Sequence, residues 1–285
     1  MLCLTTGCAS SGKAVPAPQS ENSVRIATFN IHYLRVNEKG LKGWDKQKGA
    51  VAAMIGELNP DILAFQEMES FGGGHSRNEN IQLDFVLENY PVYAAAAYSE
   101  NAGTYPITQP IIYKADMFDF VDQGFFFYSD TPDQIYSRTY NGSFPAFTSW
   151  ATLKDKASGK VFTVFNMHTD YASKSNRVKS AELMAARISP RVSNGESVFL
   201  VGDLNGHIKS KEADLLKTTP LTFVPPKGST FHFNRGINLT RAIDHIFYTD
   251  DITLESGVIV VRKKYDGEWP GDHYPVAADF SFADK

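Results

Sequence analysis

One stretch of the chain combines a predicted buried strand with side chains that could do chemistry. Residues 198–201 are apolar, Gly202 follows them, and the polar residues Asp203 and Asn205 come directly after the glycine. Such an apolar run is typical of a strand buried on both faces, and glycine allows the sharp turn that ends it. A carboxylate can accept a proton, and an amide can donate to an oxyanion. Asp and Asn are also common turn residues, so this pair indicates a site only if other strands end in the same way.

Polar side chains stand at the ends of several other predicted strands. A strand over 24–29 leads to Asn30, and one over 61–65 leads to Glu67. The full set of candidates is Asn30, Glu67, His168, Asp203, Asn205, Asp244, Asp272 and His273. In an α/β fold the ends of such strands tend to line one face, where their side chains can meet. Carboxylate ligands such as Glu67 and Asp272 suit Mg²⁺, Mn²⁺ or Ca²⁺ rather than a metal that prefers thiolates.

Apolar periodicity predicts the elements that position these residues. Helical spacing predicts helices over 44–58, 81–89, 175–189 and 210–217, the third of which ends near Pro190. The other strands are expected over 91–97, 107–113, 118–128, 147–153, 161–166, 241–248 and 252–261, with a last strand from Val276. Loops are expected over 70–80, 129–145 and 220–241. This alternation of strands and helices is typical of an α/β domain.

Length and composition predict one large domain over 24–285, preceded by a flexible tether over 1–23. The chain has 285 residues, of which 42% are hydrophobic. Its formal charge is −4, from 28 basic and 32 acidic side chains, so a polyanionic partner must be held by a local patch or through bound cations. Cys3 and Cys8 are the only cysteines, so the domain that follows has neither a disulfide nor a cysteine-ligated metal.

The first residues resemble the end of a bacterial lipoprotein signal, in which small residues precede a cysteine that becomes lipidated. Here Thr6 and Gly7 precede Cys8. The charged start of such a signal is absent and its apolar segment is only a fragment, so a tail without function is the alternative. The first interpretation predicts an exported protein, periplasmic or in the outer envelope, with Cys8 as its membrane anchor. The second predicts a cytoplasmic protein.

Six short motifs, taken in order, resemble the endonuclease/exonuclease/phosphatase superfamily. They are Phe29-Asn30, the run from Pro60 to Glu67, Asn166-Met167-His168, Gly202-Asp203-Leu204-Asn205, Ile243-Asp244-His245 and the run from Gly271 to Pro275. Any one of them is a weak signal, but six in register over 24–280 are specific. The resemblance implies a four-layer α/β/β/α sandwich, in which two mixed β-sheets pack face to face with helices outside. Spacing alone does not distinguish this fold from a doubly wound sheet.

The resemblance also implies a metal site and a base. Glu67 would be the principal ligand of Mg²⁺, Mn²⁺ or Ca²⁺, and Asn30 and Asp272 would complete or support the site. Asp203 would orient or deprotonate the attacking water. A phosphoryl centre is negatively charged and repels hydroxide, so its hydrolysis needs a cation and a positioned water.

The remaining candidates would hold the phosphate. By the same resemblance, Asn205 would bind a non-bridging phosphate oxygen, and His168 would face the leaving group as a phosphate ligand or an acid. His273 would contact the phosphate, with its tautomer fixed by Asp244, because a carboxylate on one ring nitrogen leaves the other aimed at the substrate.

Other polar residues are interpreted as structural or surface groups. The histidines without an assigned role are His32, His75, His207, His232 and His245, of which the last could alternatively line the pocket. Arg177 begins a predicted helix, and we expect it to form a structural ion pair.

The leading hypothesis is a monomeric, metal-dependent phosphoric ester hydrolase, in which water attacks a phosphodiester or a phosphomonoester. Its substrate is open among lipid headgroups, inositol or sugar phosphates, nucleotides and DNA, because loops determine it. One alternative is a nonspecific nuclease, for which Arg262-Lys263-Lys264 and a group of Lys174, Arg177 and Lys179 could contact phosphates. Another is a non-catalytic binding lipoprotein on the same scaffold. The motifs of serine hydrolases, zinc proteases and P-loop proteins are absent from the sequence.

Overall fold

The computed structural model describes residues 13–18, 20, 23–35, 38–68, 70–71 and 80–282. Cys8 with the rest of the signal-like segment, and the stretch over 72–79 with His75, lie outside the described residues. The lipid anchor therefore stays a prediction. Within the described part of the chain, no helix has the length and hydrophobicity that a bilayer crossing requires.

Two large mixed sheets form the centre of the molecule. The seven-stranded sheet has the order β13-β15-β1-β3-β6-β5, with β14 also paired to β15. Its strands are β1 (Val24–Asn30), β3 (Ile62–Gln66), β5 (Tyr93–Ala96), β6 (Ile111–Lys114), β13 (Ile252–Leu254), β14 (Ile259–Val260) and β15 (Val276–Phe282). The six-stranded sheet has the order β11-β12-β10-β9-β8-β7. Its strands are β7 (Phe118–Phe127), β8 (Phe147–Asp155), β9 (Val161–His168), β10 (Ser197–Asp203), β11 (Thr222–Val224) and β12 (Asp244–Tyr248).

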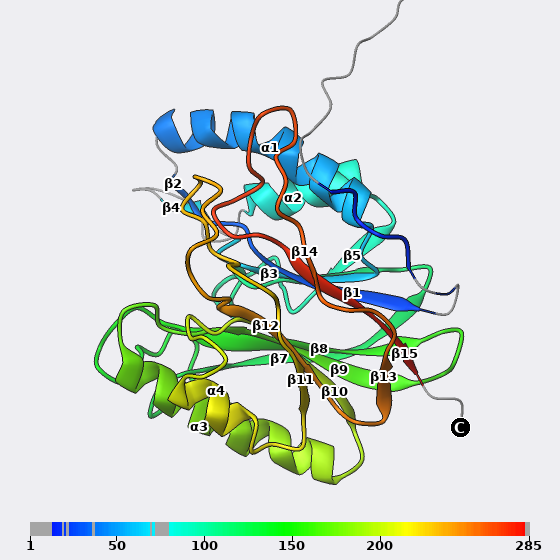
Figure 1. The fold of residues 1–285 in the computed structure, drawn as a ribbon. Helices are drawn as coiled ribbons and strands as arrows, with labels where there is room; N and C mark the ends of the chain where they lie inside the picture. The colour runs from blue at the N-terminus through cyan, green and yellow to red at the C-terminus, as the bar shows by residue number, and fades with distance from the viewer. Residues whose placement is uncertain are drawn as a thin grey trace, which may run out of the picture.

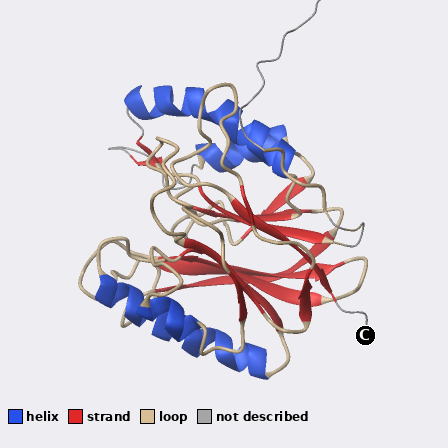
Figure 2. Cartoon of the chain, viewed as in Figure 1, coloured by secondary structure: helices blue, strands red, loops and turns tan. Residues whose placement is uncertain are grey.

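Helices cover the outer face of each sheet (Figures 1 and 2). The helices α1 (Glu38–Leu58) and α2 (Ile81–Asn89) lie over the seven-stranded sheet, and α3 (Lys174–Ser193) and α4 (Lys211–Leu216) lie over the six-stranded one. A small pair, β2 (Leu34–Arg35) with β4 (Ser70–Phe71), stands apart from both sheets. The four layers are the α/β/β/α sandwich that the family resemblance implied, so that prediction is confirmed.

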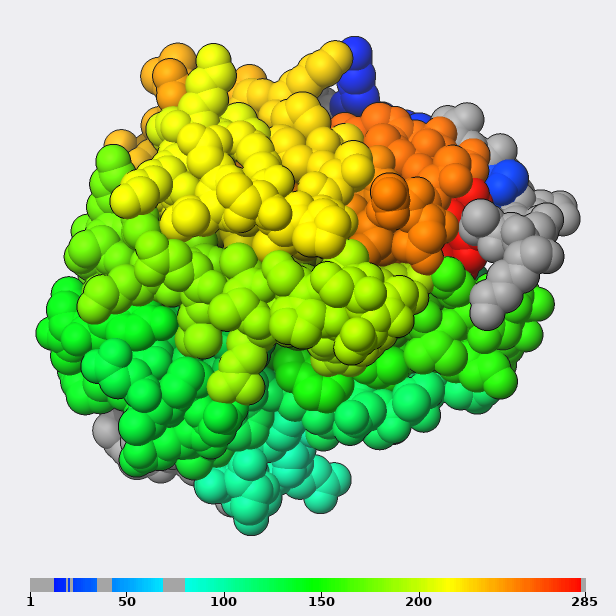
Figure 3. All heavy atoms as spheres, turned by 90° about the horizontal axis from the view of Figure 1, so that it is seen from below, coloured from blue at the N-terminus to red at the C-terminus, as the bar shows by residue number. Residues whose placement is uncertain are grey.

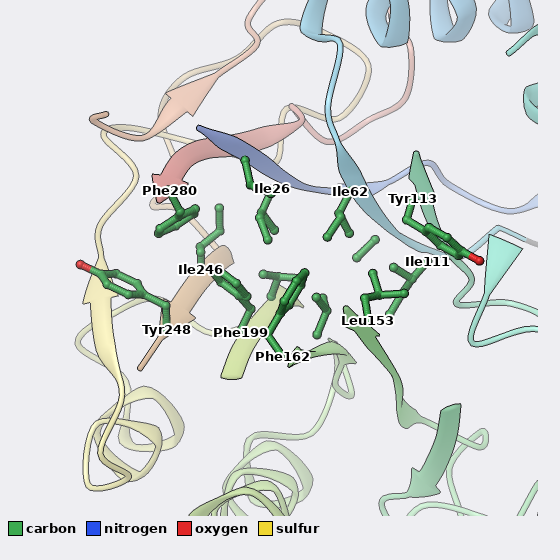
Figure 4. Packing of buried hydrophobic residues seen from close by; sticks show 14 of the residues in the cluster. Ile26, Ile62, Ile111, Tyr113, Leu153, Phe162, Phe199, Ile246, Tyr248 and Phe280 are labelled. Carbon is green, nitrogen blue, oxygen red and sulfur yellow. The ribbon is translucent and has the colours of Figure 1, made fainter. Parts of the chain in front are cut away.

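The space between the sheets is filled by apolar side chains (Figure 4). Ile26 and Ile62 from one sheet and Phe162 and Phe199 from the other belong to the same buried cluster. The rings of Phe199 and Phe280 are 5.0 Å apart at a steep angle, which is a favourable edge contact across the sandwich. These strands have apolar neighbours on both faces, the other sheet on one side and the helices on the other. This explains their continuous apolar runs.

Parallel pairing brings the functional strand ends together. In the first sheet β1 and β3 are parallel, with Asn30 opposite Gln66, and in the second β9 and β10 are parallel, with His168 opposite Asp203. Because parallel strands point the same way, each pair ends at one edge of its sheet. The two edges face each other across the sandwich, as the contacts described below demonstrate.

Several elements differ from the sequence prediction, among them α1, which begins at Glu38 rather than Trp44, and the predicted loop over 70–80, which contains β4. Helix α3 continues past Pro190 to Ser193, because the Asn194 N–H group donates to the Pro190 carbonyl at 3.0 Å and so extends the last turn. The predicted loop over 220–241 contains the strand β11, which is too short to show a period. The predicted strand over 252–261 is split into β13 and β14, where two successive N–H groups donate to the Asp279 carbonyl.

Candidate functional site

The amide of Asn30 joins the two sheets at their shared edge. Its Nδ2 donates to Glu67 Oε1 at 3.0 Å and to Asp203 Oδ2 at 3.1 Å. Asn30 ends β1, Glu67 directly follows β3 and Asp203 ends β10, so one side chain connects three strand ends. The Asn30 Oδ1 atom accepts from the His32 N–H group at 3.1 Å. The position of the Asn30 amide is therefore fixed on both sides.

A dyad of Asp244 and His273 lies against Asp203. His273 Nδ1 is 2.9 Å from Asp244 Oδ2, and His273 Nε2 is 3.8 Å from Asp203 Oδ2. Although burial opposes protonation, the Asp244 carboxylate raises the pKa of His273 to about 10. Burial, and then the charge of Asp244, raises the pKa of Asp203 to about 6. The arrangement predicted from sequence, with Asp244 on one ring nitrogen and the other turned inward, is present in the structure.

Asp203, Asp244 and His273 are also close enough to resemble a metal site, because their ligand atoms all lie within 4.8 Å of one another. All three side chains also take part in hydrogen bonds within the site. The Asp244 carboxylate contacts the imidazole, and Asp203 accepts from both Asn30 and the Asn205 N–H group, the latter at 2.7 Å.

His168 and Asn205 complete the edge formed by the six-stranded sheet. His168 Nε2 is 3.5 Å from Glu67 Oε1 and 3.9 Å from Asp203 Oδ2. The Asn205 Nδ2 atom donates to the Thr169 carbonyl at 2.9 Å, which uses one of its two hydrogens. Glu67 and Asn205 both have left-handed backbones, with φ of 55° and 49°. Such conformations cost a non-glycine residue about 1–2 kcal/mol and are concentrated at functional sites.

His32 lies in the site, although the sequence gave it no role. Its Nδ1 is 3.4 Å from Glu67 Oε2 and 3.6 Å from Asp272 Oδ2, so it stands between the two carboxylates. Although burial opposes the charged form, these carboxylates raise the pKa of His32. The only signal in the sequence is its place two residues after Asn30. His232 and His245 agree with the structural interpretation, since the first stacks on Tyr274 and the second is buried with Nε2 2.8 Å from the Gly206 carbonyl.

Buried side-chain amides connect the two sheets directly behind the site. Gln66 Nε2 donates to Asn166 Oδ1 at 2.6 Å, and Asn166 Nδ2 donates to the Phe65 carbonyl at 2.7 Å. Gln109 Nε2 donates to the Asn166 carbonyl at 3.0 Å. These bonds connect β3 with β9 immediately behind Glu67 and His168, so they fix the spacing of the two sheets where the site lies.

Gly202 is required by the close packing of β10 on β9, and we expect Gly202→Ala to unfold the site. A Cβ atom there would lie 2.0 Å from the Met167 carbonyl oxygen, and the backbone has φ of 130°. Backbone atoms on a central strand cannot move away cheaply, so the free energy of unfolding should fall by at least about 3 kcal/mol in urea titrations. Gly159→Ala is the matched control, because Gly159 has φ of 71° but no atom within 4 Å of the added carbon. Its expected loss is about 1 kcal/mol, and equal losses in the two variants would contradict this account.

The sequence profile of the endonuclease/exonuclease/phosphatase family matches residues 27–273, which includes every residue of the site. The chain belongs to this family. Its members are hydrolytic enzymes, and the family is generally dependent on divalent metals. No curated protein matches the chain.

Several solved structures of the family share the fold. An endonuclease/exonuclease/phosphatase family protein from Bacteroides thetaiotaomicron has a TM-score of 0.78 and 25% identity, over 94% of this chain and 100% of that one. A mannosyl-6-phosphatase from the same organism has a TM-score of 0.78 and 25% identity, over 91% of this chain and 100% of that one. TDP2 from D. rerio, solved with a single-stranded DNA product, has a TM-score of 0.67 at 13% identity, over 92% of this chain and 100% of that one, and shows the fold alone.

The carboxylates of this family member fit a divalent metal. Glu67 Oε2 and Asp272 Oδ1 are buried, and neither has a hydrogen-bond partner among the described residues. Although burial favours the neutral acid, the nearby His32 and His168 rings lower the pKa of Glu67 to about 2, so it is ionised. A buried carboxylate oxygen without a partner is costly, and a hard cation would satisfy it.

Proposed function

We propose that this protein is a divalent-metal-dependent hydrolase of phosphoesters that uses water as its nucleophile. The observation that carries the proposal is the Asn30 amide, which holds the partly unsatisfied carboxylate of Glu67 and the buried carboxylate of Asp203 at one point. A metal ligand and a base next to each other are the two groups that phosphoester hydrolysis requires. Membership of a family of hydrolytic enzymes supports this proposal.

Glu67 and Asp272 would hold Mg²⁺, Mn²⁺ or Ca²⁺. When bound, such a cation neutralises charge on the phosphate and on the departing oxygen. Asn30 would complete or support this site, because its Nδ2 atom donates to both carboxylates and its Oδ1 atom, which accepts one hydrogen bond from the His32 N–H group, keeps a second lone pair.

The other residues would act on the water and the phosphate. Asp203 would orient the water and accept its proton, which a carboxyl group with a pKa near 6 does more readily than an ordinary aspartate. His273, kept protonated by Asp244, would donate from Nε2 to a phosphate oxygen. Asn205 would donate its second Nδ2 hydrogen to another oxygen, and His168 would face the leaving group.

The nuclease alternative is weaker than a small phosphoester substrate. The side chain of Arg262 donates to the Lys227 and Ser229 carbonyls, and Lys263 pairs with Glu57 at 2.6 Å, so two of the three side chains in this basic run are engaged in structural contacts. The similar structure of a mannosyl-6-phosphatase makes sugar phosphates the first substrates to test.

A substrate panel tests this proposal. Mannose 6-phosphate, p-nitrophenyl phosphate, bis-p-nitrophenyl phosphate and supercoiled plasmid would each be incubated with Mg²⁺, Mn²⁺ or EDTA. We expect metal-dependent hydrolysis of at least one ester and no nicking of the plasmid. Plasmid nicking that exceeds every other activity would favour the nuclease. No hydrolysis of any substrate in the presence of metal would contradict the proposal and favour a binding lipoprotein.

A further inference from the structure

A pocket lies beside the site, on the side of Asn205. It has a volume of about 520 Å³ and lies between the start of α3, the segment that follows β10, and the loop before β12. Helix α3 and the segment after β10 lie side by side in the space-filling view (Figure 3). A volume of this size is within the range that holds small ligands.

Positive charge is concentrated in this pocket. The cationic side chains among its lining residues are Lys174, Arg177, Lys209, Lys211 and Arg241. Glu212 is the one carboxylate among the described residues that line it. The chain as a whole carries a formal charge of −4, so this concentration is local and opposite in sign to the whole. Charges of one sign gathered in a pocket attract and hold ions of the other sign.

Only Arg177 is neutralised. Its Nε atom is 3.0 Å from Oε1 of the buried Glu212, and its Nη1 atom donates to the Asp170 and Tyr171 carbonyls. This is the structural ion pair that the sequence predicted, and it forms part of the pocket wall.

The other four cations have no acidic partner. The ammonium groups of Lys174, Lys209 and Lys211 make no hydrogen bond or ion pair with any residue that the structure describes. Among the described residues Arg241 has no carboxylate partner, and its Nη1 atom lies 3.4 Å from Nε2 of the His207 ring. Four exposed cations without a carboxylate partner among the described residues therefore line one pocket.

The pocket is continuous with the site. Asn205 lines the pocket, and its N–H group donates to Asp203. Phe231 also lines it, and the Phe231 ring is 4.8 Å from the His273 ring. A molecule whose phosphate is held at Asn205 and His273 can therefore reach into the pocket.

Resting on the proposed function, we infer that the substrate is a small phosphoester that carries a second phosphate, and that Lys174, Lys209, Lys211 and Arg241 bind this second group. Ammonium and guanidinium groups are the usual partners of a phosphate dianion, and several of them are needed to balance its charge. A small molecule fits better than a polynucleotide, because the free cations gather in one pocket while Arg262 and Lys263 are engaged elsewhere.

The first test measures binding without turnover. Fructose 1,6-bisphosphate would be titrated calorimetrically into the full chain in EDTA, in the wild type, in Lys209→Gln/Lys211→Gln and in the control Lys46→Gln/Lys154→Gln. All four lysines are exposed, and the control pair lies on α1 and β8, away from the pocket. We expect at least tenfold weaker binding in the pocket variant and no change in the control. Equal affinity in all three proteins would overturn the inference.

The second test measures preference with Mg²⁺ present. Wild-type kcat/KM for the bisphosphate should exceed that for fructose 6-phosphate at least tenfold, and the pocket variant should lose this ratio. Turnover of both esters with equal kcat/KM would overturn the inference and leave the proposed function standing. Weakened binding in the first test without turnover of any ester would refute the proposed function while the pocket remained a phosphate site. The same titration would be made with a single-stranded DNA 12-mer. If the pocket variant bound only the DNA more weakly than the wild type, and not the bisphosphate, the choice of a small molecule would be overturned.

Discussion

Glu67→Gln should lower kcat/KM by about 10³-fold and abolish tight Mn²⁺ binding. Glutamine has nearly the same shape, so the Asn30 amide can still donate to its Oε1 position, and the fold should be kept. The change removes the negative charge whose second oxygen makes no hydrogen bond in the described structure and lies 3.4 Å from His32 Nδ1. Both effects can be measured on one preparation, the rate with a phosphoester and the metal affinity by calorimetry.

Glu57→Gln is the matched control for this change. Glu57 is also a partly buried, ionised glutamate, but it pairs with Lys263 at 2.6 Å and lies on α1 rather than in the site. We expect its variant to hydrolyse substrate and bind metal as the wild type does. Wild-type Mn²⁺ affinity in Glu67→Gln would show that Glu67 is not the metal ligand.

Asp203→Asn should lower kcat by about 10³-fold while Mn²⁺ affinity changes little. An amide cannot accept the proton of the attacking water, although it fills the same space between Asn30 and His273. Asp203 is buried beside Asp244, so removing one of two neighbouring negative charges should leave the fold at least as stable. Urea unfolding of the variant would check this last point.

The control for Asp203 is Asp133→Asn, because Asp133 is exposed and pairs with Arg187 away from the site. A carboxylate that acts as a base is distinguished from one that binds the metal by comparing the loss of kcat with the loss of Mn²⁺ affinity. A loss of metal affinity as large as the loss of rate in Asp203→Asn would make Asp203 a metal ligand, and the Asp203, Asp244 and His273 group would then be the metal centre.

The site residues that follow a short buried strand could be predicted from local sequence. Glu67 and Asp203 come after four or more apolar residues, and that pattern depends only on local sequence. The pairing of the two sheets needed the family resemblance, because periodicity does not specify which strands are neighbours. Pro190 was predicted to end its helix, but the helix continues because a later backbone bond, which no sequence pattern shows, extends its final turn.

The features that the sequence did not predict depend on residues far apart in the chain. His32 joins the site only because Glu67 and Asp272 both approach it, and Asp272 is distant in sequence. The cationic pocket combines Lys174, the lysines after β10 and Arg241, each of which alone resembles an ordinary exposed side chain. Such arrangements arise from tertiary packing, so the sequence indicated only one part of the pocket, the basic group of Lys174 and Arg177, and not the lysines after β10 or Arg241.

A Mn²⁺ titration of the EDTA-treated wild type, with bound metal and the rate of hydrolysis followed on the same sample, tests the central claim most directly. The claim is that a metal at Glu67 and Asp272 enables phosphoester hydrolysis by the neighbouring Asp203. We predict a rate at background in EDTA that rises with the same midpoint as metal binding. A rate that is the same with and without EDTA, or metal that binds without raising the rate for any ester of the panel, would contradict the claim.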